Sequence, residues 1–151
     1  MKIIIDTNIV FSALLKTQTT FGQIIFNSTG IFEFYCPHYL RTEIRKHWDR
    51  LKRISKLTDK QLQESYEALL SKITFINEEL IPQKVWEDAE KLTTGIDVDD
   101  TVFVALTKYV KGKLWSGDNT LQAGLKKKGY KAILTTPEIH KLWIKKREKL
   151  K

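Results

Sequence analysis

Hydrophobic residues along the chain fall into two patterns, short continuous runs and longer stretches with helical spacing. The short runs, bounded by polar residues or glycine, predict strands, whereas apolar residues spaced three and four apart predict amphipathic helices. The predicted strands cover residues 2–5, 31–36, 73–76, 113–116 and 130–134. The predicted helices cover residues 9–15, 19–28, 37–53, 58–72, 82–92, 101–110 and 121–129, and a last one follows residue 136.

Local signals mark several helix ends. Thr58 followed by Gln61 fits a capping box, in which each side chain accepts a hydrogen bond from the other residue's backbone amide. Pro82 suits the first turn of a helix, because backbone N–H groups there have no hydrogen-bond acceptor within the helix and proline lacks only that group. Thr136, followed by proline and glutamate, is the expected cap of the C-terminal helix.

The alternation of strands and helices predicts an α/β fold. Parallel neighbours in a sheet need a crossover connection, and helices normally supply it. We therefore expect a three-layer α/β/α sandwich with a central parallel sheet of about five strands, formed by a single domain over residues 1–151. Ligands of such sheets bind outside the carboxyl ends of the strands, so residues that directly follow a strand are the strongest site candidates.

The composition favours a polyanionic partner. The chain has 26 Lys and Arg against 18 Asp and Glu, which gives a formal net charge of +8, although each basic run alone is also explained as a solvated helix face. No apolar run approaches the roughly 20 residues of a membrane helix, so we expect a cytoplasmic protein without a membrane partner. The single cysteine, Cys36, is expected to be a buried structural thiol.

Acidic residues stand where predicted strands end and predicted helices begin. Asp6 follows the first strand, Asp118 follows the fourth, and Asp97, Asp99 and Asp100 precede the helix expected after them. Each acid alone is explained as a helix cap or as a charge favoured by the helix dipole. Their repetition at ends that a parallel sheet brings together favours a shared site.

Glu43 lies within or beside the apolar stripe of the helix predicted over residues 37–53. Burial disfavours a charged carboxylate, so this side chain should be protonated, paired with a base such as Arg50, or bound to a cation. The other acids favour the cation, because carboxylates held together repel one another unless a positive charge compensates. Hard oxygen ligands select Mg²⁺ or Mn²⁺, and one or two ions are expected.

Other chemistries fit less well. Zinc is disfavoured because the one cysteine and three scattered histidines lack ligand spacing. The chain has no glycine-rich phosphate loop, dinucleotide fingerprint or nucleophile elbow, which argues against P-loop nucleotide hydrolysis and serine hydrolysis. The tryptophans stand in apolar patterns and are predicted to be core residues rather than base-stacking platforms; they are Trp48, Trp86, Trp115 and Trp143.

The combined pattern resembles the PIN domain family, which includes the VapC-type toxins of prokaryotic toxin–antitoxin modules. The resemblance rests, in order, on residues 3–8, Glu43, residues 97–106 and residues 114–118. By position, the family's metal-binding acids match Asp6, Glu43, Asp100 and Asp118, with Asp97 and Asp99 as rivals to Asp100. Asn8 and Ser116 match polar positions that help hold the site, whereas Thr120 stands where many relatives have a further Asp.

The resemblance implies a Mg²⁺- or Mn²⁺-dependent endoribonuclease that hydrolyses RNA phosphodiester bonds and leaves 5′-phosphate and 3′-hydroxyl ends. For a toxin it also implies a protein antitoxin and a homodimer, and RNA processing is the other role of such proteins. Two alternatives stay open. One is a PIN-like nucleic-acid-binding or regulatory domain with weak catalysis, and the other is a receiver-type phosphoacceptor, for which the acidic pair beside the first strand is missing.

Overall fold

The computed structural model describes residues 1–15 and 19–151. Its centre is a five-stranded sheet in which each strand pairs in parallel with its neighbours. The strand order is β3-β2-β1-β4-β5. The strands are β1 (Lys2–Ile5), β2 (Glu33–Pro37), β3 (Ile73–Ile76), β4 (Lys113–Trp115) and β5 (Ile133–Leu134).

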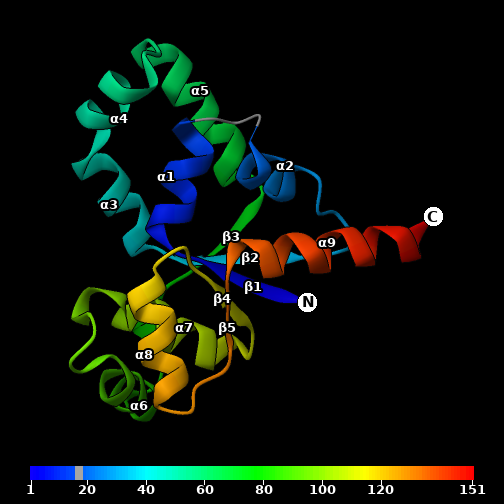
Figure 1. The fold of residues 1–151 in the computed structure, drawn as a ribbon. Coiled ribbons are helices and arrows are strands. Elements are labelled where there is room, and N and C mark those ends of the chain that lie inside the picture. Colours follow the sequence, from blue (N-terminus) through cyan, green and yellow to red (C-terminus); the bar gives the residue numbers. More distant parts are fainter. Residues whose placement is uncertain (16–18) are drawn as a thin grey trace.

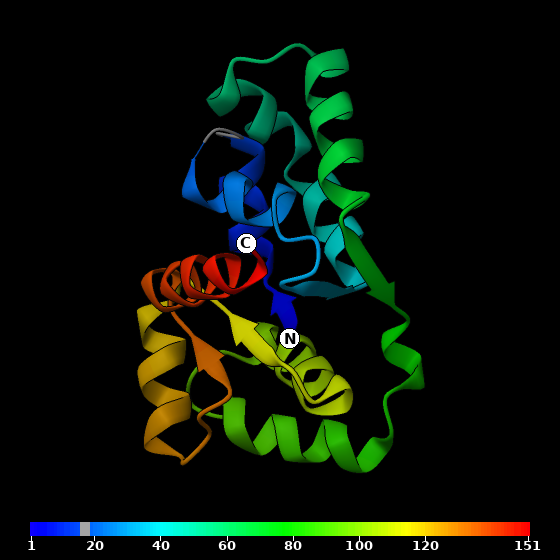
Figure 2. The same ribbon diagram turned by 90° about the vertical axis from the view of Figure 1, so that its right-hand side faces the viewer.

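Helices cover both faces of this sheet (Figure 1). They are α1 (Thr7–Leu15), α2 (Thr20–Phe26), α3 (Tyr39–Lys46), α4 (Trp48–Ser55), α5 (Asp59–Leu70), α6 (Gln83–Thr93), α7 (Thr101–Val110), α8 (Asn119–Lys127) and α9 (Thr136–Leu150), with short 3-10 helices η1 (Glu78–Leu80) and η2 (Val98–Asp100). Helices α1 to α5 lie on one side, and α6, α7 and α8 on the other. The view at right angles shows α4 and α5 reaching away from the sheet (Figure 2). The predicted α/β/α sandwich is confirmed.

The core is centred on β1 because helices pack against both of its faces. Ile3, Ile4 and Ile5 are fully buried, which explains why this strand is continuously apolar rather than alternating. On one face α7 packs across β1, β2 and β4. Among the described residues, none of the helices combines the length and the apolar character that crossing a bilayer requires.

The strand order creates a switch point between β1 and β4. From β1 the chain builds β2 and β3 to one side, and it then returns to place β4 and β5 on the other. A crevice forms outside the carboxyl ends of strands at such a point. Ile5 pairs in register with Trp115, so the residues that follow them, Asp6 and Ser116, are neighbours at this crevice.

Residues 37–53 form two helices, and the prediction of one helix was wrong. The backbone of His47, with φ −106° and ψ 15°, separates α3 from α4. The break lets the Trp48 ring pack edge-on against Tyr66 of α5, with ring centroids 5.5 Å apart. Packing between helices therefore outweighs a local sequence that contains no helix breaker.

Smaller differences concern element ends. The capping box at Thr58 is confirmed, but β2 includes Pro37, and β5 has two residues where five were predicted. The cap of α9 is Thr135, which forms a capping box with Glu138, and not Thr136. The Thr136 hydroxyl instead accepts a hydrogen bond from the buried Trp115 indole at 3.0 Å, a contact that only the folded chain provides.

Gly112 allows β4 to begin close against β1. A Cβ atom there would lie 2.7 Å from the Lys2 carbonyl oxygen and 2.7 Å from Ile4 Cδ1. We expect Gly112→Ala to lower the free energy of unfolding by about 1–3 kcal/mol, because the backbone of β1 would have to shift. Urea denaturation measures the loss. Gly117→Ala is the control, since its Cβ would meet Ile9 Cδ1 only at 4.0 Å; equal losses in both variants would contradict the close approach.

Candidate metal site

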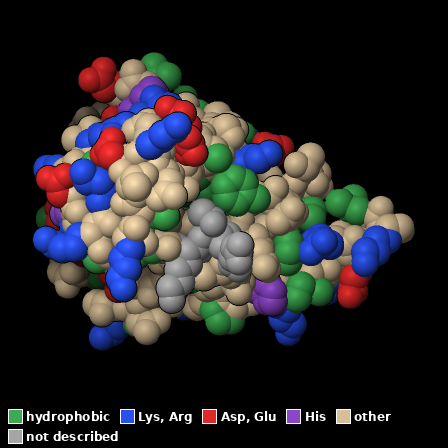
Figure 3. Space-filling view, turned by 90° about the horizontal axis from the view of Figure 1, so that it is seen from above, with side chains coloured by type: hydrophobic (Ala, Val, Ile, Leu, Met, Phe, Trp, Pro, Cys, Tyr) green, Lys and Arg blue, Asp and Glu red, His purple; other side chains and the backbone are tan. Residues whose placement is uncertain are grey.

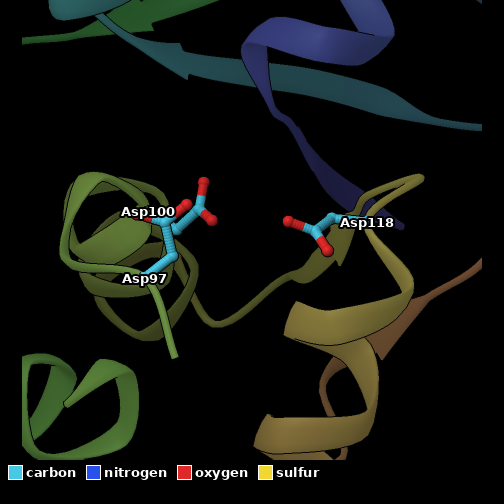
Figure 4. A group of neighbouring side chains, drawn as sticks. All are labelled: Asp97, Asp100 and Asp118. Atoms are coloured by element: carbon cyan, nitrogen blue, oxygen red, sulfur yellow. The ribbon is translucent and has the colours of Figure 1, made fainter. Parts of the chain in front are cut away.

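Three carboxylates meet at the switch point. One carboxylate oxygen from each of Asp97, Asp100 and Asp118 lies within 4.8 Å of the other two. A search of the described residues for three His, Cys, Asp or Glu side chains at this spacing finds these three acids. Asp97 and Asp100 lie at the two ends of the turn before α7, and Asp118 lies between β4 and α8. Figure 4 shows the side chains from these two segments facing each other.

Two of the three acids also cap helices. Asp118 Oδ1 accepts hydrogen bonds from the Thr120 and Leu121 amides at 2.9 and 3.1 Å, and Asp97 Oδ1 accepts one from the Asp99 amide at 2.9 Å. These bonds hold each side chain through one oxygen and leave Oδ2 for another partner. The capping explanation and the shared-site explanation are therefore compatible.

Asp6 lies beside this group and is buried, with 3% of its surface exposed. Its Oδ1 accepts a hydrogen bond from the Ile9 amide at 3.0 Å. Burial raises the pKa of Asp6 from 3.8 to about 6, hydrogen bonds from Ser116 and from the Ile9 and Asn8 backbone lower it, and the Asp118 charge raises it. Asn8 thus acts on Asp6 through its backbone, while its side chain is exposed.

Ser116 connects Asp6 with Asp118. It is fully buried, its Oγ accepts a hydrogen bond from the Asp118 amide at 3.1 Å, and its side chain hydrogen-bonds to Asp6. The same residue therefore holds the backbone of one acid and the side chain of another. The supporting role that the family resemblance implies for Ser116 stays a prediction.

Asp100 is partly buried among four other acids. Burial, followed by the charges of Asp97, Asp6, Asp118 and Asp99, raises its pKa from 3.8 to about 7. Its side chain makes no capping bond to α7. Across the described part of the chain, the ion pairs within 4.0 Å involve other acids, and no Lys or Arg neutralises this group.

Glu43 lies outside the group of three. It is half-buried on α3, where its carboxylate accepts a hydrogen bond from the Tyr39 hydroxyl and its Oε2 lies 3.8 Å from His47 Nε2. Its partners are therefore Tyr39 and His47 rather than Arg50. Its role as a metal ligand stays a prediction.

Tyr39 donates a hydrogen bond to Glu43, lies within the electrostatic influence of Asp99, and was not among the predicted site residues. The hydrogen bond to Glu43, burial, and the charges of Glu43 and Asp99 raise the pKa of Tyr39 to about 12. The sequence signal was its position four residues before Glu43, one helical turn away. Asp99 is exposed and, like Glu43, lies outside the group of three; its role as a ligand also stays a prediction.

Comparisons with known proteins agree with this fold. VapBC2 from Rickettsia felis bound to a DNA fragment from their promoter matches with a TM-score of 0.66 and 13% identity, over 89% of this chain and 97% of that chain. A toxin–antitoxin complex from Klebsiella pneumoniae matches with a TM-score of 0.59 and 18% identity, over 88% of this chain and 96% of that chain. No curated protein gives a significant match. The family model of the PIN domain matches residues 4–142, and the chain therefore belongs to the PIN domain family.

Proposed function

We propose that this chain is a divalent-metal-dependent ribonuclease and the toxin of a toxin–antitoxin pair. The observation that carries the proposal is the meeting of Asp97, Asp100 and Asp118 at the switch point of a PIN-domain sheet. Enzymes of this architecture bind their ligands at that point. The alternative is a PIN-domain protein that binds nucleic acid but cleaves it weakly.

The chemistry of the site fits Mg²⁺ or Mn²⁺. The donors are carboxylate oxygens, which hard cations prefer. Burial and the repulsion between acids raise the pKa values of Asp6 and Asp100. A bound cation would stabilise the ionised form of both carboxylates. Asp97, Asp100 and Asp118 would hold the ion, and Asp6, Glu43 and Asp99 are the further candidate ligands.

The chain's own residues would orient the reactants. Caps on two helices hold the carboxylates of Asp97 and Asp118, and Ser116 holds Asp6. Asp100, without a capping bond, is the acid freest to orient an attacking water molecule. When bound, a divalent cation lowers the pKa of a coordinated water and stabilises charge on the phosphate.

The charge of the chain supports a nucleic acid substrate. Its formal net charge is +8, and Figure 3 shows Lys and Arg side chains spread over the viewed face, mixed with Asp and Glu. Such a distribution attracts polyanions without selecting a sequence. The choice of RNA rests on the PIN-family resemblance.

The toxin role rests on the compared structures. Both are toxin–antitoxin complexes by their descriptions, and each is covered almost completely by this chain's fold. We therefore infer a protein antitoxin as the partner.

The toxin role predicts that induced expression arrests growth. Asp6→Asn, expressed to the same level, should leave growth unaffected, because the site acid is lost while a buried hydrogen-bonding side chain of the same shape remains. Growth curves measure the effect. Normal growth with abundant active wild-type protein would argue for an RNA-processing enzyme instead.

Without a divalent cation, stability should fall as the pH rises. The pKa of Asp6 is raised from 3.8 to about 6 in the folded state, so the proton that stabilises the fold below pH 3.8 is lost as the pH rises through about 6. We expect the titration of Asp6 alone to lower the free energy of unfolding in EDTA by about 1.4 kcal/mol between about pH 5 and about pH 8, measured by urea denaturation. Mg²⁺ should restore stability at the higher pH and have little effect at the lower. A flat profile in EDTA would contradict the electrostatic account.

Purified protein should cleave single-stranded RNA with Mg²⁺ or Mn²⁺ and not with EDTA. Asp6→Asn and Asp118→Asn should each lower the cleavage rate at least about a hundredfold, since loss of outer-shell groups alone costs up to that much. Asn caps a helix as well as Asp does, so Asp118→Asn should stay folded.

The matched control for cleavage is Asp49→Asn, whose side chain is 96% exposed on α4. It should cleave like the wild type. Full activity in Asp6→Asn would remove that residue from the site. Tight RNA binding by a wild-type protein that never cleaves would favour the binding-domain alternative.

A further inference from the structure

Two adjoining hollows lie beside the acidic group. Trp86, Val98 and Thr101 line both of them. Their volumes are about 390 and 320 Å³, within the range of small-molecule sites. Asp99 lines the smaller one, and Asp99 and Thr101 are the chain neighbours of Asp100. The smaller hollow is therefore lined by the residues on either side of Asp100 in the chain, within the segment that carries two of the three site acids.

The walls of these hollows offer flat apolar surfaces. The ring of Trp86 is half-buried, unlike Trp115 and Trp143, which belong to the buried core. Val98 is 74% exposed at the rim, and the half-buried Tyr39 lines the smaller hollow. Exposed aromatic and aliphatic surfaces beside a nucleic-acid site are the places where unpaired bases stack.

The charged groups of the smaller hollow are hydrogen-bond acceptors. Glu78 and Asp99 contribute carboxylates, and Glu78 Oε2 accepts a hydrogen bond from the Tyr39 amide at 3.2 Å, which holds that side chain against α3. Two acidic side chains repel a phosphate. They attract the amino groups that adenine, cytosine and guanine carry, whereas the exocyclic groups of uracil are carbonyl oxygens.

We propose that the smaller hollow receives an unpaired base of the RNA strand, stacked on Trp86, and that it prefers bases with an amino group over uracil. The inference rests on the proposed ribonuclease function. It adds that the substrate is single-stranded at this point, because a base inside a duplex cannot enter the hollow. The phosphate joined to that base would lie toward Asp100. Trp86 also packs against the hydrophobic core, as predicted, so the proposal gives its partly exposed ring a second role.

The test is the binding of short fluorescein-labelled oligoadenylate, oligocytidylate and oligouridylate, measured by fluorescence anisotropy with Ca²⁺ present so that a cation that prefers oxygen ligands can offset the repulsion between phosphate and the acids. Oligoadenylate and oligocytidylate should bind at least about fivefold tighter than oligouridylate. Trp86→Leu should weaken oligoadenylate binding about five- to a hundredfold, since a stacked base is lost. Trp86→Phe keeps an aromatic ring and should retain most of the binding.

Glu78→Gln tests the same idea without touching a packed ring. Its remaining carbonyl oxygen can still accept the Tyr39 amide, while its amide group can donate to uracil. The preference against oligouridylate should therefore shrink at least about threefold. Glu79→Gln, an exposed neighbour in η1 that does not line the hollow, should leave it unchanged.

The outcomes separate the two proposals. Equal binding of all three oligonucleotides, unaffected by Trp86→Leu and Glu78→Gln, would overturn the base site even if RNA is cleaved. Base-dependent binding that Trp86→Leu removes would support it even if no metal produces cleavage, and the absence of cleavage would then count against the ribonuclease alone.

Discussion

The parallel pairing of β1 with β4 is the contact on which the rest of the site depends. Ile5 lies opposite Trp115 in the register, which makes Asp6 and Ser116 neighbours and brings Asp118 within range of both. A slip of one residue would turn Asp6 away and place an apolar side chain at the crevice. The close approach at Gly112 and the buried isoleucines of β1 therefore stabilise a site that lies beyond the end of the strand.

The same arrangement brings a cost in stability and an advantage in function. Within the described part of the chain these carboxylates lie near one another without a Lys or Arg ion pair, and burial together with their repulsion raises the pKa values of Asp6 and Asp100. Helix amides and Ser116 offset part of this cost through hydrogen bonds that favour the ionised form. These bonds also fix the side chains, so the free oxygens need little rearrangement to bind a cation. Strain of this kind is expected where local stability is exchanged for a binding site.

Sequence reasoning succeeded where backbone position alone decides the outcome. Asp6 and Asp118 follow strands, and the carboxyl ends of parallel strands meet, so their proximity followed from the alternation of strands and helices. It failed where distant side chains decide. The break at His47 depends on packing of Trp48 against Tyr66. The partners of Glu43 are local, since Tyr39 and His47 stand one helical turn to either side of it, and their spacing was a signal that sequence reasoning missed. Trp86 packs against the core as its apolar pattern predicts, but the pattern does not tell that its ring also lines a hollow.

Different parts of the protein attract the RNA and select its bases. The net positive charge acts at long range on any polyanion and distinguishes no base. The acidic crevice repels phosphate unless a cation is bound, so attraction alone does not place the strand in the site. Selection then falls to the short-range contacts of the hollow, whose walls come from α3, η1, α6, η2 and the start of α7 rather than from the strands. Because those walls lie outside the sheet, their residues can change without altering the pairing of β1 with β4 that places Asp6 and Asp118.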